Sequence, residues 1–148
     1  PVELDALCSR FRLDLVQAPF NLLDRRLMDS GWMARLQASG IELHVRSVFL
    51  QGLLLTKPHD RPKQFDRWAA LWKKYDAWLG QSGLTPLQAC LRYVLSFAEI
   101  DRVIVGIDSK NQLAEILEAA DGPAPSLPGT IAVAEPDLIN PTRWNTLA

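Results

Sequence analysis

The stretch DRVIVGIDSKNQLAEILEAA (101–120) decides the fold class of this 148-residue chain. Its first seven residues form a compact apolar run rich in β-branched side chains, which predicts a buried strand over 101–107. Ser109 then provides a helix N-cap, and the apolar spacing that follows predicts a helix over 110–120. A short buried strand followed at once by a helix is typical of the repeating unit of a parallel sheet.

The same alternation continues upstream of this unit. Thr85 and Pro86 provide an N-cap and a proline at the first helical position, which predict the start of a helix that runs to Leu95. Residues 57–64 are a polar loop, and the chain from residue 122 onward is a proline-rich tail. Apolar runs predict strands at 13–20 and 41–50, and helical spacing predicts a helix over 2–11 and helices at 26–39 and 64–80.

Three parallel strands do not make a self-sufficient sheet, because two long apolar edges would stay unpaired and prone to aggregation. Closure of a barrel removes such edges. We therefore expect an α/β fold that is the C-terminal part of a (β/α)8 TIM barrel, with residues 1–148 in one domain and 113–148 containing the last helix and the tail. The first residue is proline rather than methionine, so we expect a chain that was cut, processed or truncated.

The amino-acid composition and charge argue against nucleic acid and membranes as partners. The chain carries 16 basic and 17 acidic side chains, a balance that gives no electrostatic footprint for nucleic acid or an anionic membrane. No apolar run approaches the ~20 residues that span a bilayer, and the start PVELDALCSR is unlike a signal peptide. Cys8 and Cys90 are too few for a disulfide framework, so we expect a reduced, cytoplasmic protein.

Three segments in order resemble the aldo-keto reductase family. VQAPFNLLDRR (16–26) is similar to the family's sixth barrel strand and the loop after it. RSVFLQGLLLTK (46–57) is similar to the seventh strand and its cofactor loop. QACLRYVLS (88–96) and VIVGIDSKNQLAEIL (103–117) are similar to the seventh helix, the eighth strand and the eighth helix.

The resemblance implies an oxidoreductase that uses NADP or NAD to reduce an aldehyde or ketone, with sugar-type carbonyls included, by hydride transfer. The family's catalytic Asp, Tyr, Lys and His come from the first half of the barrel. No catalytic residue is therefore assigned in this chain, and the expected partners are a small carbonyl substrate and the missing N-terminal half of the barrel. The alternative is a truncated or regulatory module that binds without catalysis.

Two residues at strand ends are implied to face the nicotinamide. The resemblance implies that the amide of Gln17 pairs with the nicotinamide carboxamide, whereas a polar strand cap is the alternative. Strand 41–49 alternates apolar and polar residues, which would place Arg46 inside the barrel at its C-terminal mouth. We hypothesise that Arg46 stacks on nicotinamide or pairs with an acidic or polyhydroxylated substrate. The alternative is an internal ion pair with Glu42 or with an aspartate or glutamate of the missing part of the barrel.

The loop after this strand is implied to hold the pyrophosphate. Ser47, Phe49 and Gly52 match the family's positions there, and Lys57 matches the lysine at the end of the motif. A loop that wraps a diphosphate needs exposed amides and a glycine that permits close approach. Val48 departs from the usual proline, and an ordinary loop is the alternative.

The start of the last helix is implied to hold the adenosine phosphate. Unpaired amides and the helix dipole at Ser109 favour an anion. Asp108 stands where the family has an arginine that grips the 2′-phosphate, and Ile116 replaces an asparagine that meets adenine. A carboxylate repels a phosphate unless Lys110 compensates, so we predict a weakened preference for NADPH. The candidate cofactor residues in this segment are Gly106, Asp108, Ser109, Lys110, Gln112 and Glu115.

Two further patterns have plain structural interpretations. The aromatic stripe over 65–79, including Trp68 and Trp72, is expected to pack in the core rather than form a binding surface. We expect His44 to be structural and His59 to be solvated, since no metal-ligand spacing surrounds either residue and no metal site is assigned.

Overall fold

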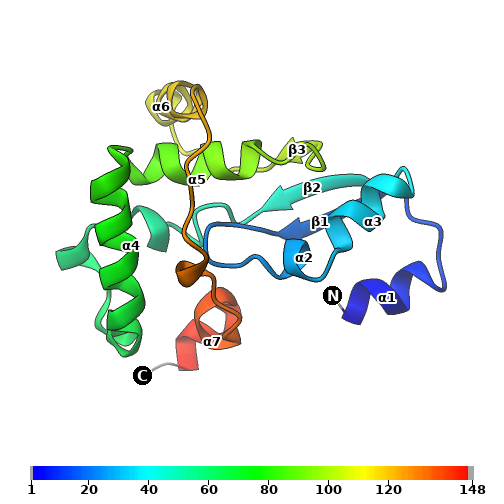
Figure 1. The fold of residues 1–148 in the computed structure, drawn as a ribbon, viewed down its shortest axis with the longest axis horizontal. Coiled ribbons are helices and arrows are strands. Elements are labelled where there is room, and N and C mark those ends of the chain that lie inside the picture. Colours follow the sequence, from blue (N-terminus) through cyan, green and yellow to red (C-terminus); the bar gives the residue numbers. More distant parts are fainter. Residues whose placement is uncertain (1, 147–148) are drawn as a thin grey trace.

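A computed structural model describes residues 2–146, and its centre is one parallel sheet (Figure 1). The sheet has the order β1 (Leu15–Pro19), β2 (Glu42–Arg46) and β3 (Arg102–Val103). Gln17 of β1 lies opposite His44 of β2, which in turn lies opposite Arg102 of β3. The predicted set of three parallel strands with flanking helices is confirmed.

Helices flank the sheet and connect its strands. The α-helices are α1 (Val2–Cys8), α2 (Arg26–Asp29), α3 (Trp32–Ala38), α4 (Ala69–Ser82), α5 (Pro86–Leu95), α6 (Lys110–Ala120) and α7 (Pro136–Ile139). Short 3-10 helices are η1 (Leu53–Leu55), η2 (Pro58–Asp60), η3 (Lys63–Trp68), η4 (Gly129–Ile131) and η5 (Pro141–Thr146). No helix in the described part is long and apolar enough to cross a bilayer.

The two faces of β2 have different surroundings: one packs in the core and the other is more exposed. Leu43 and Val45 are fully buried under the helices, whereas Glu42 and His44 are half-buried and Arg46 is exposed on the other face. This is the alternation predicted for a barrel strand, with the polar set on the inner face. The functional side of the sheet is therefore the side that the helices leave open.

The aromatic stripe belongs to the core, as predicted. The side chains on the inner faces of η3 and α4 are buried; they are Phe65, Trp68, Trp72 and Tyr75. The indole of Trp72 donates to the Phe65 carbonyl at 3.0 Å, and the Tyr75 hydroxyl donates to the Leu54 carbonyl at 2.9 Å. Each buried polar tip thus has a partner, which removes the desolvation cost of an unpaired group.

Three predicted helices differ from the structure. The helix expected over 26–39 is two helices, because Gly31 adopts a left-handed φ of 75° between α2 and α3. The helix expected over 64–80 begins as the 3-10 helix η3 and becomes α-helical only at Ala69. The first helix ends at Cys8 rather than near residue 11. A local break in hydrogen bonding leaves the apolar spacing intact, so periodicity alone overestimates these lengths.

The predicted strands were wrong in extent and in burial. The strand expected over 101–107 has only two ladder residues, and Ile104 and Ile107 are 43% and 47% exposed. The N–H groups of Asp101 and Ile104 donate to the carbonyls of Leu43 and Val45, and among residues 2–146 this segment pairs with no strand other than β2. The strand at 13–20 is also not fully buried. The physical reason is that both segments are sheet edges, with a neighbour on one side only.

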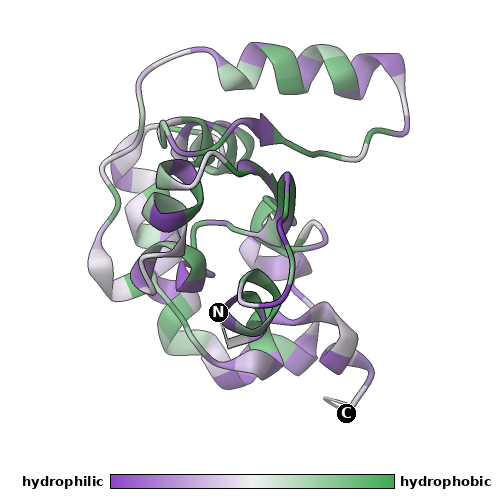
Figure 2. Cartoon of the chain, turned by 90° about the vertical axis from the view of Figure 1, so that its right-hand side faces the viewer, coloured by the Kyte–Doolittle hydropathy of each residue, from purple (hydrophilic) through white to green (hydrophobic). Residues whose placement is uncertain are grey.

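Exposed apolar side chains gather along both edges. Figure 2 shows α6 at the periphery of the molecule with apolar residues along its length. On the β3 side the exposed residues are Ile104, Ile107, Leu113 and Leu117, and on the β1 side they are Leu7, Phe11 and Leu15. Unpaired strand edges flanked by exposed apolar side chains are typical of surfaces that another protein segment covers.

The proline-rich tail is an ordered strap across the molecule (Figure 1, orange). The indole of Trp78 donates to the Ser126 carbonyl at 2.9 Å, and Trp68 donates to the Glu135 carboxylate at 2.7 Å. Ile131 is fully buried, and the N–H of Val133 donates to the Leu23 carbonyl at 2.9 Å. The strap therefore fixes the loop that follows β1.

Candidate cofactor site

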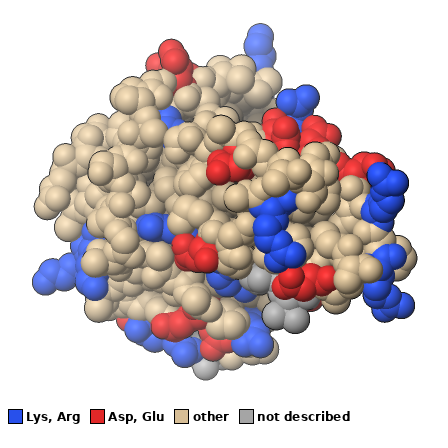
Figure 3. Space-filling model, turned by 45° about the vertical axis from the view of Figure 1, so that its right-hand side comes forward, with Lys and Arg blue, Asp and Glu red and all other residues tan. Residues whose placement is uncertain are grey.

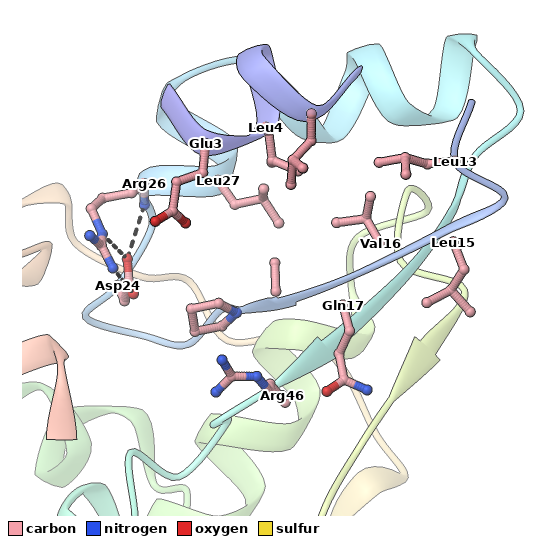
Figure 4. A pocket seen from close by; sticks show the side chains of 13 residues that line it. Glu3, Leu4, Leu13, Leu15, Val16, Gln17, Asp24, Arg26, Leu27 and Arg46 are labelled. Carbon is pink, nitrogen blue, oxygen red and sulfur yellow. Dashed lines mark hydrogen bonds and ion pairs between the residues drawn. The ribbon is translucent and has the colours of Figure 1, made fainter. Parts of the chain in front are cut away.

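Gln17 and Arg46 lie on the same face of the sheet, one diagonal step apart in the register. Pro19 lies opposite Arg46 in the register, and both side chains extend on the same side (Figure 4). They line a hollow of about 460 Å³ that follows the free edge of β1 beneath α1. An amide and a flat guanidinium on one face of a sheet can each offer hydrogen bonds to a planar polar group.

An ion pair closes one end of this hollow. Asp24 is buried and accepts two hydrogen bonds from the Arg26 guanidinium, each at 2.9 Å. The Asp24 hydrogen bond raises the pKa of Arg26 above its ordinary value. Because the two charges compensate each other, they leave Arg46 as the exposed cation of the hollow's lining.

Arg46 does not form an ion pair with Glu42. Within residues 2–146 its guanidinium donates to the Ser47 hydroxyl at 3.1 Å, and no bond joins it to Glu42. The Glu42 carboxylate instead lies 3.1 Å from His44 Nε2, without the alignment of a hydrogen bond. Arg46 therefore keeps most of its donors free on the open face. His44 is only partly buried, and His59 is exposed, as predicted.

The loop at 47–52 has an unusual backbone. Ser47, Leu50 and Gln51 have φ values of 59°, 47° and 54°, and Gly52 has 83°. Left-handed conformations cost an L-residue about 1–2 kcal/mol each, so this loop stores strain that the surrounding structure must hold. Strain of this kind concentrates at ligand-binding sites.

The same loop presents unpaired backbone donors. Among the described residues, the N–H groups of Phe49, Gln51 and Gly52 donate to no protein acceptor. A Cβ added at Gly52 would meet nothing within 4 Å, so the space beside it is open. Free amides in an open loop can bind the oxygens of an anion such as pyrophosphate. Lys57 is exposed farther along, where η2 begins.

The N-terminus of α6 is a second cluster of donors. The Ser109 hydroxyl accepts from the Gln112 N–H at 3.1 Å, which confirms the predicted cap. The N–H groups of Lys110 and Asn111 have no partner among the described residues, and Gly106 lies in open space. Free amides at the positive end of a helix dipole fit a phosphate.

The structure shows the surroundings of Gln112 and Ile116, two positions at the predicted adenosine end. The Gln112 side-chain carbonyl accepts from the Asp108 N–H at 2.7 Å, so this amide is partly occupied within the chain. Ile116 is buried against the core, and its side chain faces away from solvent. Glu115 and Lys110 are exposed.

The predicted residues therefore fall into two groups at the carboxyl end of the sheet. Parallel strands bring their carboxyl ends to the same end of the sheet, where Arg46 and Ser47 lie. Gln17, predicted at a strand end, is instead in the middle of β1, opposite His44. The β3 residues from Gly106 onward follow on the opposite side of β2, since β2 is the central strand. The site assignments remain predictions.

Sequence reasoning missed the buried polar residues of the loop after β1. Asn21, Asp24 and Arg25 are each less than 10% exposed. Asn21 donates to the Ser47 carbonyl at 3.1 Å and so joins the loops that follow β1 and β2. The signal was present, since polar residues inside the apolar run FNLLDRR are unusual unless they are paired.

Charged side chains do not segregate by sign on the face that Figure 3 shows. Figure 3 shows basic and acidic side chains intermingled over the face in view. Within residues 2–146, no group of three His, Cys, Asp or Glu side chains has the arrangement to hold a metal ion. The candidate site is therefore the carboxyl edge of the sheet.

The parallel sheet and its flanking helices define the class of fold, which is part of a (β/α) barrel. In such barrels the loops that follow the strands form the ligand site. The sequence profile described as the aldo/keto reductase family matches residues 4–125. The chain belongs to this family, which is a family of oxidoreductases.

Solved structures agree in fold. The chain superposes on an aldo-keto reductase, AKR11C1 from Bacillus halodurans, in its apo form, with a TM-score of 0.69 and 20% identity over 97% of this chain and 51% of that one. The holo form gives a TM-score of 0.63 and 19% identity over 100% and 47%. The chain thus spans about half the length of the structures it matches. A comparison with curated proteins finds no match.

Proposed function

We propose that this chain is the C-terminal half of an NAD(P)-dependent oxidoreductase that reduces an aldehyde or ketone, with sugar-type carbonyls among its substrates. The observation that carries the proposal is the pair of donor clusters at the carboxyl edge of one sheet, at loop 47–52 and at the start of α6. A dinucleotide has two separated anionic regions, and two separated clusters of free amides fit them.

In this proposal the residues of β1, β2 and the loop after β2 bind the nicotinamide and the pyrophosphate. Gln17 pairs with the carboxamide of the nicotinamide, and Arg46 offers its flat guanidinium to the ring or its charge to the substrate. Ser47, Phe49 and Gly52 hold the pyrophosphate through the loop amides. Lys57 adds a positive charge beside them.

The adenosine end binds at α6. Gly106 permits close approach, Ser109 shapes the first turn, and the free N–H groups of that turn receive a phosphate oxygen. Lys110 adds a positive charge, and Glu115 and the free NH2 of Gln112 face the nucleoside. When bound, the nicotinamide cofactor supplies the hydride, and a proton donor within hydrogen-bond reach of the carbonyl oxygen has to come from outside this set of residues.

We propose further that a complementary half-barrel covers both edges. The exposed apolar residues beside β1 and β3 support this, because a soluble protein seldom leaves two strand edges and their flanking apolar surface uncovered. That half would bring the remaining strands and the proton donor.

A second candidate is a binding module without catalysis. The same open edges favour it, since they would bind a partner in place of the remaining strands. The two functions differ in turnover and not in cofactor binding, so both measurements are needed.

The test uses the full-length protein expressed from its gene. Titration with NADH and NADPH, followed by fluorescence, gives the affinity, and oxidation of the reduced cofactor with a panel of aldehydes, ketones and sugars gives turnover. Gln17→Ala should weaken dinucleotide binding about tenfold, whereas Gln81→Ala, at an exposed glutamine of α4, should leave it unchanged. Binding without turnover would support the module, and no binding would refute both.

A further inference from the structure

The strained loop at 47–52 needs an external support. Three residues that are not glycine hold left-handed φ values in this loop. Val48 and Leu50 are buried and anchor the loop through their side chains. Buried side chains fix where the loop sits, but they do not by themselves hold the peptide of Ser47 in a disfavoured conformation.

Asn21 supplies a contact to that peptide. Its Nδ2 donates to the Ser47 carbonyl at 3.1 Å, and the same carbonyl accepts the Leu50 N–H at 2.9 Å. Asn21 is 1% exposed, so solvent has little access to this bond. The Ser47 carbonyl thus has both lone pairs occupied in the left-handed conformation and would lose one partner in any other.

Asn21 is itself held rigidly. Its Oδ1 accepts from the N–H groups of Leu23 and Asp24 at 3.0 and 2.9 Å, and its own N–H donates to the Asp24 carbonyl at 3.2 Å. The strap reaches the same turn through the N–H of Val133, which donates to Leu23. The Oδ1 atom and the backbone N–H of Asn21 are therefore fixed by the turn, independently of the contact with Ser47.

We propose that Asn21 is a positioning residue, which holds Ser47 in its left-handed conformation and so presets loop 47–52 for the pyrophosphate of a dinucleotide. This inference rests on the proposed function for the identity of the ligand. Asn21 reaches the loop through its carboxamide NH2 and acts through Ser47. A loop that is already shaped loses less conformational freedom when the ligand binds.

The decisive variant is Asn21→Asp in the full-length protein. A carboxylate keeps the acceptor for Leu23 and Asp24 but replaces the donor to Ser47 by an oxygen that repels its carbonyl. Asn140→Asp is the matched control, because Asn140 also accepts through Oδ1, from the N–H and hydroxyl of Thr142, and donates through Nδ2 to no group in the described residues.

We expect Asn21→Asp to weaken NADH and NADPH binding at least tenfold and Asn140→Asp to change it less than twofold. The Ser47→Gly background separates positioning from a general structural role, since glycine adopts a φ near 59° without strain. In that background Asn21→Asp should cost at most threefold. An equal loss in both backgrounds, or no loss in either, would overturn the inference.

Amide hydrogen exchange provides a readout that needs no ligand. The Leu50 and Leu54 amides, which close the loop, should exchange at least tenfold faster in Asn21→Asp than in Asn140→Asp. Unchanged exchange would overturn the inference even if affinity fell. A wild type that binds neither dinucleotide would refute the proposed function, and exchange would still decide whether Asn21 holds the loop. If Asn21→Asp does not fold, Asn21→Ser, which keeps an acceptor but cannot reach Ser47, takes its place.

Discussion

The side-chain carbonyl of Gln112 accepts a hydrogen bond from the backbone N–H of Asp108 at 2.7 Å. This bond fixes the turn that leads into α6 and leaves the Asp108 carboxylate exposed beside the free first-turn amides. An anion that approaches the helix therefore meets favourable amides and an unfavourable carboxylate together. The balance between them sets the coenzyme preference that we expect.

The first prediction concerns that preference. The full-length protein should bind NADPH less than tenfold more tightly than NADH, a gap below about 1.4 kcal/mol. Asp108→Arg removes the repulsion and adds a bidentate phosphate donor, so the NADPH to NADH affinity ratio should rise at least tenfold. Asp121→Arg, the same charge change at the C-cap of α6, is the control. A wild type with a strong NADPH preference would contradict the role given to Asp108.

The second prediction separates two roles for Arg46. If its flat guanidinium stacks on nicotinamide, Arg46→Lys should weaken cofactor binding almost as much as Arg46→Ala, by about tenfold. If its charge pairs with an acidic substrate, Arg46→Lys should keep most of the activity and Arg46→Ala should raise KM. Arg12→Ala, at an exposed arginine before β1, serves as the control. Untouched affinity and turnover in both Arg46 variants would end the hypothesis.

Helix starts could be predicted from the sequence because their causes are local. Thr85 accepts from the Gln88 N–H and Gln88 reaches back to Thr85, which forms a capping box at the predicted start of α5. Ser109 does the same work for α6 through Gln112. Each cap acts over three residues, so the pattern contains the whole interaction.

Strand limits and the loop geometry could not be predicted in this way. The length of β3 depends on whether Ile104 finds a second neighbour, which is a property of the sheet and not of the segment. In the candidate site, Gly52 signals a left-handed residue, but Ser47 and Leu50 do not, since their conformation comes from Asn21 and from packing. Tertiary contacts outweighed local preference at those positions.

The third prediction concerns alkaline pH. Burial raises the pKa of the Cys90 thiol to about 12 from an ordinary value of 9.0, and burial also raises the pKa of Tyr75. Above pH 9.0 the unfolded chain loses the Cys90 proton while the folded chain keeps it. The free energy of unfolding should therefore fall as pH rises from 9.0 toward 12, with the full contribution present only below 9.0.

Urea unfolding measures this effect. Between pH 9 and roughly 10.5 the Cys90 contribution should fall by about 1–2 kcal/mol, so Cys90→Ala should show a shallower alkaline decline than the wild type. Tyr75→Phe should also flatten the decline, and it should cost about 1–2 kcal/mol at neutral pH because the Leu54 carbonyl loses its donor. Cys8→Ala, in α1, is the control. Identical pH slopes in all variants would contradict the buried thiol.

The last prediction tests whether another half-barrel covers the edges. Leu117 is 65% exposed on α6, in line with Leu113, while Ile116 and Ala119 bury the other side of the helix. If a complementary half packs on that stripe, Leu117→Lys buries a charge and should lower the stability of the full-length protein by about 2–4 kcal/mol. Glu118→Lys, one position on and exposed, should change it by less than about 0.5 kcal/mol. Because a lysine at a position that stays in water costs almost nothing, equal stability of the two variants would show that α6 is uncovered and would remove the support for a second half-barrel.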